Sequence, residues 1–153
     1  MRKTYKTVRG SAVRVVVMRF DTKIAVLLRE DLATWQRLNV TAFLTSGITA
    51  GDPELVGEPY LDADDTRYLP MLRQPVLVFE AGKELLTTAH AKAVARELPT
   101  AIFTADLFST GHDEANRAAV RAVPRDALDL VGLALRGPRN AVDKIVKGAH
   151  MHP

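Results

Sequence analysis

The sequence predicts one α/β domain, a three-layer α/β/α sandwich around a mixed, mostly parallel sheet of about four strands. Four apolar runs of strand length alternate with segments in which apolar residues recur every three or four positions, as in a helix. The clearest unit begins with KIAVLL at 23–28, a run typical of a strand buried on both faces. Arg29, Glu30 and Asp31 follow it, at the strand end where α/β sheets bind ligands.

A first helix is expected after this charged triplet. Its residues at helical spacing are Trp35, Leu38, Ala42 and Phe43, and Trp35 suits a core or interface position. Ser46-Gly47 is predicted to end the helix. Closely spaced glycines and prolines then predict a loop over residues 48–60.

The next segment is rich in aspartate and favours a hairpin tip. A calcium loop beginning at Asp62 would need glycine at its sixth position and glutamate at its twelfth. The sequence has Arg67 and Arg73 there, so Asp62, Asp64 and Asp65 are interpreted as turn residues.

The second half of the chain completes the α/β pattern. In order, we expect a strand at 75–80, a helix at 85–94, a strand at 100–108, a short alanine-rich helix within 109–123, a strand at 128–135 and a last helix opened by Gly137-Pro138. The helix between strands 75–80 and 100–108 predicts that these two strands pair in parallel. The tail HMHP is expected to fray.

The positive charge of the chain is confined to its beginning. Residues 1–19 carry six basic and no acidic side chains, whereas the remaining 134 carry 15 basic and 18 acidic ones. The body therefore lacks the basic excess typical of a polyanion-binding domain. No apolar run approaches membrane-helix length, and the absence of cysteine suits a reducing cytoplasm.

Residues 1–17 form a basic leader with three open interpretations. They are a basic arm with an extra edge strand, a targeting peptide, or sequence upstream of a true start at Met18. The third is favoured, because MRFDTKIAVLL would enter the first strand directly. The single α/β domain is then 18–153.

Two family resemblances follow from these segments. KIAVLLREDLATWQRLNVTAFLTSG resembles the opening of the type II peptidyl-tRNA hydrolases, in which an apolar strand ends in Arg-x-Asp-Leu and leads into a helix. Residues 18–148 are also similar to a bacterial family defined only as domain of unknown function number two thousand, through REDLATWQRLNVTAFLTSGI and STGHDEANRAAV. The resemblances imply a hydrolase-like fold, and fold transfers more securely than function.

The hydrolase resemblance implies specific site residues. Arg29 and Asp31 match the Arg-x-Asp pair after the first strand, and Asp106 and Thr110 match an Asp and a Thr after the third. The family's helix lysine falls on Asn39, which carries no charge, and an arginine after the third strand is also lost. Compared with the hydrolases, the chain thus keeps the acceptors Asp106 and Thr110 and lacks the lysine and the arginine.

Ester hydrolysis needs a base to orient water and positive charge or donors to stabilise the oxyanion. By the resemblance, Asp106 could orient the water and Thr110 could hold it. Arg29 or Arg117 would then have to supply the missing charge.

Structural interpretations compete with each of these roles. Asn39 could cap a helix beginning at Val40, and Arg29 with Asp31 could form a surface ion pair. Asp106 is harder to explain without a site, because it interrupts an apolar run. The geometric expectation is that the side chains at 31, 39, 106 and 110 share one hollow.

His112, Asn116 and Arg117 belong to one exposed turn after the third strand. They are either a solvated helix start or a lid that presents His112 as an acid or base and borders the cleft with Asn116 and Arg117. His90 is expected to be solvated, and His150 with His152 lacks a third ligand. No metal and no cofactor is predicted.

Two functions remain from the sequence. The first is a module that binds a small molecule at the strand-end cleft, with a homodimer formed through the alanine-rich helix. The second is a hydrolase acting on peptidyl-tRNA or a related ester with an altered site. The uncharged Asn39 and the negative body favour the first, whereas Asp106 and Thr110 favour the second.

Overall fold

A computed structural model of the chain describes residues 2–6 and 15–153. The strands of its main sheet are β3 (Thr22–Arg29), β6 (Val76–Ala81), β7 (Thr100–Thr104), β8 (Leu130–Pro138) and β9 (His150–Met151). Its α-helices are α1 (Thr34–Gly51), α2 (Lys83–Ala95), α3 (Asp113–Arg121) and α4 (Arg139–Ile145). Short 3-10 segments occur at Pro53–Leu55, Ala105–Ser109 and Arg125–Ala127. No helix in this described part is both long and apolar enough to span a bilayer.

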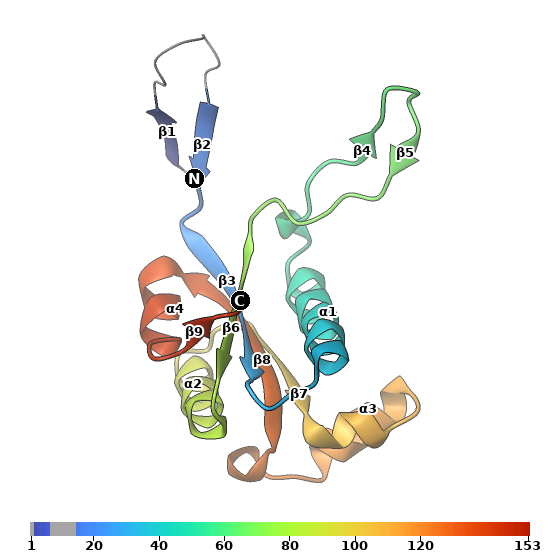
Figure 1. Cartoon of the computed structure of the whole chain (residues 1–153), viewed down its shortest axis with the longest axis vertical. Coiled ribbons are helices and arrows are strands. Elements are labelled where there is room, and N and C mark those ends of the chain that lie inside the picture. The colour runs from blue at the N-terminus through green and yellow to red at the C-terminus, as the bar shows by residue number, and fades with distance from the viewer. Residues whose placement is uncertain (1, 7–14) are drawn as a thin grey trace.

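The main sheet has the order β7-β8-β3-β6-β9 (Figure 1). β3 and β6 are parallel, whereas β3–β8, β7–β8 and β6–β9 are antiparallel. The predicted α/β class with a mixed sheet is confirmed. The prediction of a mostly parallel sheet of about four strands is wrong, because the described residues form five strands with one parallel pair.

Burial explains this strand order. Residues 130–135 of β8 are buried on both faces, as are residues 24–28 of β3, so these two strands occupy the centre. β6 and β7 are mostly half-buried and lie outside them. β6 and β7 run in the same direction, as predicted from the helix that connects them. However, β3 and β8 lie between them, so the prediction that they pair directly is wrong.

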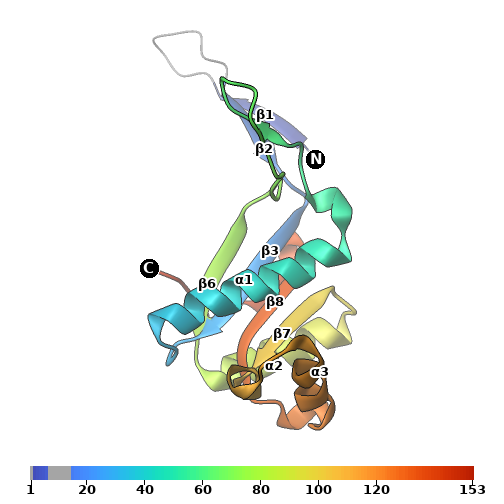
Figure 2. The same cartoon turned by 90° about the vertical axis from the view of Figure 1, so that its right-hand side faces the viewer.

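Helices cover both faces of the sheet. α1 crosses one face (Figure 2), where Val40, Leu44 and Ile48 pack with the side chains of β3 that point to that side. α2 and α4 cover the opposite face. Because successive side chains of a strand alternate, Ile24, Val26 and Leu28 belong to the α1 layer, whereas Ala25 and Leu27 belong to the other.

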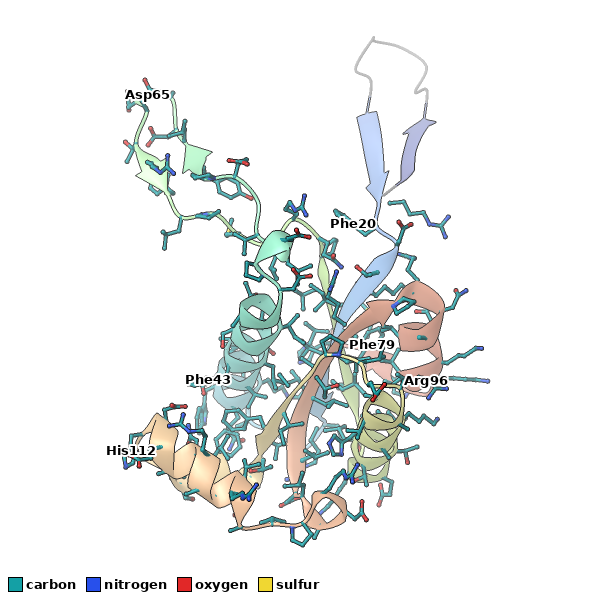
Figure 3. All side chains as sticks on the ribbon, turned by 180° about the vertical axis from the view of Figure 1, so that it is seen from behind. Phe20, Phe43, Asp65, Phe79, Arg96 and His112 are labelled. Atoms are coloured by element: carbon teal, nitrogen blue, oxygen red, sulfur yellow. The ribbon has the colours of Figure 1, made fainter. Side chains whose placement is uncertain are left out.

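Between α1 and β6 the chain leaves the body as a hairpin, here called the arm (residues 57–71). It contains β4 (Tyr60–Leu61) and β5 (Arg67–Tyr68), with Asp65 at its end (Figure 3). The Asp62 carboxylate accepts hydrogen bonds from the backbone N–H of Thr66 (2.9 Å) and Asp64 (3.0 Å) and from the Tyr68 hydroxyl (2.8 Å). These bonds, that from the Thr66 backbone most of all, lower the pKa of Asp62. The predicted aspartate turn is confirmed.

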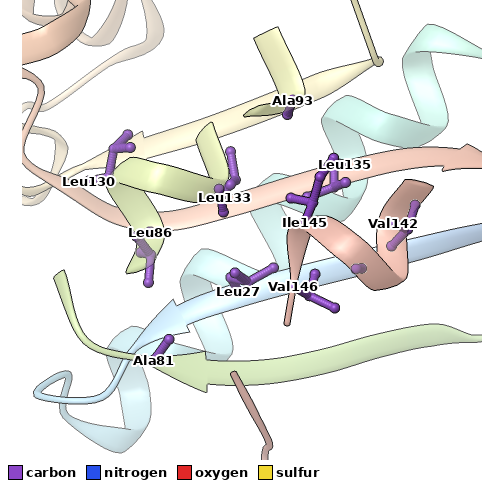
Figure 4. Packing of buried hydrophobic residues seen from close by; sticks show 12 residues of the cluster. Leu27, Ala81, Leu86, Ala93, Leu130, Leu133, Leu135, Val142, Ile145 and Val146 are labelled. Atoms are coloured by element: carbon purple, nitrogen blue, oxygen red, sulfur yellow. The ribbon is translucent and has the colours of Figure 1, made fainter. Parts of the chain in front are cut away.

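The core on the α2–α4 side is a layer of aliphatic side chains (Figure 4). Leu86 and Ala93 of α2 and Ile145 of α4 contact the face of the sheet that carries Leu133 and Leu135. All five are nearly or fully inaccessible to solvent. Such aliphatic burial, at about 25 cal/mol per Å² of apolar surface, is the main force holding the layers together.

The first helix is longer than predicted. α1 begins after Ala33 and continues to Gly51, so Ser46-Gly47 does not end it and residues 48–51 are not loop. Ile48 continues the buried face of the helix. Gly47 permits a close approach to β7, since an added Cβ would lie 3.1 Å from the Ala101 Cβ. Asn39 lies inside the helix and therefore is not the N-cap of a helix beginning at Val40.

Two predictions near the ends of strands are also wrong. The strand expected at 100–108 ends at Thr104 and turns into the 3-10 segment Ala105–Ser109, because its register with β8 is broken after Phe103. β8 extends through Gly137 and Pro138, so α4 begins only at Arg139. The tail does not fray: β9 pairs with β6, and the His152 N–H donates to the Val78 carbonyl (3.0 Å).

The basic leader lies partly outside the described residues, at positions 1 and 7–14. β1 (Arg2–Lys6) and β2 (Val15–Arg19) pair with each other in an antiparallel hairpin. These two strands form a sheet of their own, and the three interpretations of residues 1–17 stay predictions.

His90 is buried in α2, which corrects the prediction of a solvated side chain. Burial lowers the pKa of His90 below its ordinary value of 6.5, Arg125 lowers it further, and Asp126 opposes them. His90 follows Ala89 and precedes Ala93 by three residues, so it shares the buried face of α2 with them.

This burial predicts a pH-dependent stability. At a pH above the pKa that His90 has in the unfolded protein, His90 is neutral in both the folded and the unfolded state. Below that pKa, the unfolded protein binds a proton at His90, whereas the folded protein, in which the pKa is lower, does not. The free energy of unfolding should therefore fall as the pH decreases from 6.5 towards the lowered pKa of the folded state. Denaturant unfolding across this interval should show a smaller slope for His90→Gln, and an unchanged slope would contradict the prediction.

Candidate functional site

A hollow of about 500 Å³ lies between α1 and the start of α3. It has four aromatic side chains on its walls and four polar residues of the predicted set beside them. The aromatic residues are Trp35, Phe43, Phe103 and Phe108. The polar residues are Asn39, Thr110, His112 and Asn116.

Helix periodicity explains one wall of this hollow. Trp35, Asn39 and Phe43 are spaced by four residues along α1, so their side chains form one stripe on its surface. Trp35 is 62% exposed and Phe43 is 54% exposed, so of the two positions expected for Trp35 the core is excluded and the interface stays a prediction. Figure 3 shows Phe43 on α1 and His112 at the start of α3 on the same side of the molecule.

The aromatic rings form a connected series. The ring centroids of Trp35 and Phe108 are 5.8 Å apart, those of Phe108 and Phe103 are 5.1 Å apart, and those of Phe103 and Phe43 are 5.9 Å apart. The first and last pairs meet edge to face, which is a favourable geometry for aromatic rings. The series fixes the shape of the hollow while leaving Trp35 and Phe43 accessible.

The start of α3 arranges the polar groups. His112 is the N-cap, and its Nδ1 accepts a hydrogen bond from the Ala115 backbone N–H (3.2 Å). The Thr110 hydroxyl lies within hydrogen-bond reach of the Leu107 carbonyl (2.9 Å) and of the Asn116 side-chain oxygen.

These bonds leave donors for a ligand. Because the Nδ1 of His112 accepts the Ala115 N–H, the other ring nitrogen, Nε2, is left to present an N–H to a ligand. Asn116, with its oxygen beside Thr110, presents the two hydrogens of its amide nitrogen. The hollow therefore offers apolar ring faces together with hydrogen-bond donors.

A second, more polar cleft of about 280 Å³ lies at the ends of β3 and β6. Arg29 bridges two carboxylates there, with Nε 2.7 Å from Asp31 and Nη1 2.8 Å from Asp129. Lys83 lies 3.0 Å from the same oxygen of Asp129. Each cation in the cleft thus already has an anionic partner.

The charges of this cleft shift each other's pKa values. The hydrogen bond from Lys83, followed by the charge of Arg29, lowers the pKa of Asp129 despite its partial burial. Burial alone would lower the pKa of Arg29, but the bonds and charges of Asp31 and Asp129 outweigh it and raise that pKa. Asp129 therefore remains an anion that holds two cations.

The structure divides the predicted site residues into separate places. The hollow contains Asn39, Thr110, His112 and Asn116, and Arg117 borders an adjoining apolar hollow of about 700 Å³ between α3 and β7. The cleft contains Arg29 and Asp31. Asp106 is exposed on the 3-10 segment and lines none of these three spaces. The expectation that 31, 39, 106 and 110 share one hollow is thus correct for 39 and 110 and wrong for 31 and 106.

The reason is the early end of β7. β7 ends at Thr104, whereas a strand that continued to Phe108 would have kept Asp106 in the sheet. The 3-10 turn places its backbone outside the sheet, and Phe103 and Phe108 pack together instead.

Sequence reasoning missed several residues of these sites. The apolar pattern places Phe103 and Phe108 in one buried strand, and it indicates no role for Lys83 or Asp129. The five-residue spacing of the two phenylalanines gave no signal, because only the 3-10 turn brings them together. Lys83 and Asp129 flank the strands β6 and β8, so knowledge of the strand order would have placed both beside Arg29. No three His, Asp or Glu side chains within residues 2–6 and 15–153 are placed to hold a metal ion.

Comparisons with known proteins place this fold among relatives. A family model described as a protein of unknown function (DUF2000) matches residues 22–153. A solved structure of a protein of unknown function from Agrobacterium tumefaciens strain C58 is similar with 47% identity and a TM-score of 0.85. The similarity covers 88% of this chain and all of that one. No curated protein matches this chain.

Proposed function

We propose a function for this chain from the geometry of its site. The chain belongs to DUF2000, a family of proteins of unknown function, so the family supplies no activity to start from. The function is to bind a small molecule with a planar aromatic or heteroaromatic ring and hydrogen-bond acceptors on its edge. The ligand occupies the hollow between α1 and α3. The observation that carries the proposal is the joint presence of exposed ring faces and amide and imidazole donors around one space.

The size and composition of the hollow support this assignment. Ligand sites in proteins commonly have volumes of a few hundred Å³, with mostly apolar walls and a few polar groups that set orientation. Trp35 and Phe43 offer rings for stacking, and Asn39 lies between them on the same stripe of α1. Asn116 and His112 face them from the other wall with hydrogen-bond donors.

The arrangement favours binding over catalysis. The Nδ1 of His112 already accepts a backbone N–H, so this nitrogen is not free to act as a base, and Nε2 is left as a donor. Asp106, the candidate base for activating water, lies outside the hollow. Stacking and hydrogen-bond donors can orient a ring without proton transfer by His112 or Asp106.

The proposal can be tested through the sole tryptophan. Trp35 borders the hollow, so its fluorescence reports directly on occupancy. We expect saturable quenching by adenosine or nicotinamide and no change with ribose, which has no ring system for stacking. Asn39→Leu should weaken the binding roughly 5- to 10-fold, the value of one net hydrogen bond. Asn140→Leu, on α4 across the sheet, is the matched control and should bind as the wild type does.

An absence of saturable quenching by either heteroaromatic probe would refute this ligand class. Equal affinity of the wild type and Asn39→Leu would refute the role given to the stripe on α1.

Ester hydrolysis is the alternative function. One observation favours it: the Thr110 hydroxyl is held at the edge of the hollow while Arg117 borders the adjoining one and could contact an anionic substrate. Release of the peptide from a peptidyl-tRNA by the purified protein, abolished by Thr110→Val, would establish this reaction. An intact peptidyl-tRNA would exclude it.

A further inference from the structure

We propose that a second copy of this chain docks on a surface formed by the arm and the outer face of α1. The surface, here called the arm–helix surface, consists of Trp35, Leu38, Phe43, Tyr60, Leu61, Tyr68, Leu69 and Met71. A dimer on this surface would cover Trp35 and Phe43, which also border the hollow, so the second copy and the proposed ligand compete for these two side chains.

Exposed apolar side chains are concentrated on this surface. Nine large hydrophobic residues are exposed among those whose burial the structure describes, and each is at least half accessible to solvent. Eight belong to α1 or the arm, and Met151 on β9 is the other. α1 and the arm extend along the same side of the molecule (Figure 1). Scattered exposed apolar residues are ordinary, but eight of them gathered on one helix and on the hairpin that follows it indicate an interaction surface.

The arm itself needs a covering partner. Its two strands are two residues long, and isolated two-stranded hairpins are marginally stable in water. Hydrogen bonds join its base at Gly57 and Met71 and its tip around Asp62, but its leucines and tyrosines contact no core of their own. Burying them against another protein surface would supply the missing stabilisation.

The size of the surface fits a dimer of identical chains. Eight side chains that each expose roughly 100 Å² amount to about 800 Å², which is the share of one partner in a standard interface. Each copy carries both an arm and an α1, so a two-fold axis lets each arm cover the other's helix and closes the assembly.

Charges support the same pairing. The arm carries the exposed carboxylates of Glu58, Asp64 and Asp65. α1 contains no acidic residue, and the neighbouring α3 adds Arg121, which forms no ion pair with any residue whose side chain is described. An arm laid over a partner's α1 therefore brings its carboxylates towards a helix that contains Arg37 and no acidic residue.

The first test measures the mass of the full chain in solution. Sedimentation velocity at about 100 µM should give twice the 16.8 kDa of one chain. Leu61→Asp with Leu69→Asp should weaken dimerisation on the order of 100-fold, as expected when central contacts are lost. These positions are exposed and do not line the hollow, so circular dichroism and quenching of Trp35 should be retained.

Two controls make this test decisive. Met151→Asp, an exposed apolar position away from the surface, should leave the dimer intact. Ala118→Glu on α3 should also leave the dimer intact. If the chains paired through α3, this variant would disrupt the dimer. A wild type that remains at 16.8 kDa would overturn the proposal, as would a dimer that survives in the arm variant.

A second test locates the contact. Since the chain has no cysteine, Leu38→Cys and Leu69→Cys each introduce a unique thiol. Mixing the two variants with a short bismaleimide should give a covalent dimer that is absent when Met151→Cys replaces Leu69→Cys. A dimer by mass that yields no such product would place the interface elsewhere and overturn the assignment.

Discussion

Replacing Gly132 with valine should destabilise the fold by about 3 kcal/mol or more, at the upper end of the cost of overpacking a core. Gly132 is buried in the central strand β8, directly beneath α1. A Cβ at this position would lie 2.4 Å from the Val40 Cγ1 and 2.9 Å from the Leu44 Cδ1. Both distances are too short for carbon atoms, so α1 or β8 would have to move.

Guanidinium unfolding followed by circular dichroism measures this effect. Gly132→Ala should cost about 1–3 kcal/mol, and Val40→Ala should reduce that cost because it removes the nearer clashing methyl. Gly111→Ala is the matched control, since no atom lies within 4 Å of its added Cβ. A neutral Gly132→Ala would show that α1 does not pack on β8 at this distance.

Leu44→Ala should cost about 2–5 kcal/mol, whereas Phe43→Ala next to it should cost less than about 1 kcal/mol. Leu44 is 2% exposed and packs in the layer between α1 and the sheet, but Phe43 is mostly exposed and faces the hollow. The expected order is opposite to that of side-chain size. Equal losses of unfolding free energy, measured in guanidinium, would contradict the orientation of α1.

The two variants also separate stability from function. Phe43→Ala removes one ring from the hollow, so it should weaken ligand binding while the fold persists. Leu44→Ala should leave the affinity of the remaining folded protein largely unchanged, because its side chain lies in the core beneath the hollow. A stronger loss of affinity in Leu44→Ala than in Phe43→Ala would place the ligand elsewhere.

Much of the fold could be predicted from the sequence. The run KIAVLL is apolar at every position after its lysine, and a strand of this kind has to be covered on both faces, as β3 is. The spacing in α2 and the aspartate turn of the arm were also readable, because both depend on residues close together in the chain. α1 gave a weaker signal, since its apolar residues surround the helix and the buried set, Val40, Leu44 and Ile48, does not stand out from the exposed one.

The candidate site was only half predictable. Asn39 and Thr110 do meet, but the resemblance to the hydrolases also placed Asp31 and Asp106 with them. Asp31 is held by Arg29 in the separate cleft, and Asp106 follows a strand that ends four residues earlier than its apolar sequence suggested. Where a strand ends depends here on its register with β8, which lies some thirty residues further along the chain.

The sequence by itself determined where most of the main strands and helices lie, though not all of their ends, and that β3 must be covered on both faces, because hydrophobic periodicity acts over a few residues. The tertiary structure decided that β8 lies between β3 and β7, that a 3-10 turn brings Phe103 beside Phe108, and that the apolar arm extends from the body. Each of these outcomes depends on which distant segments pack against each other, and a local sequence pattern does not determine that.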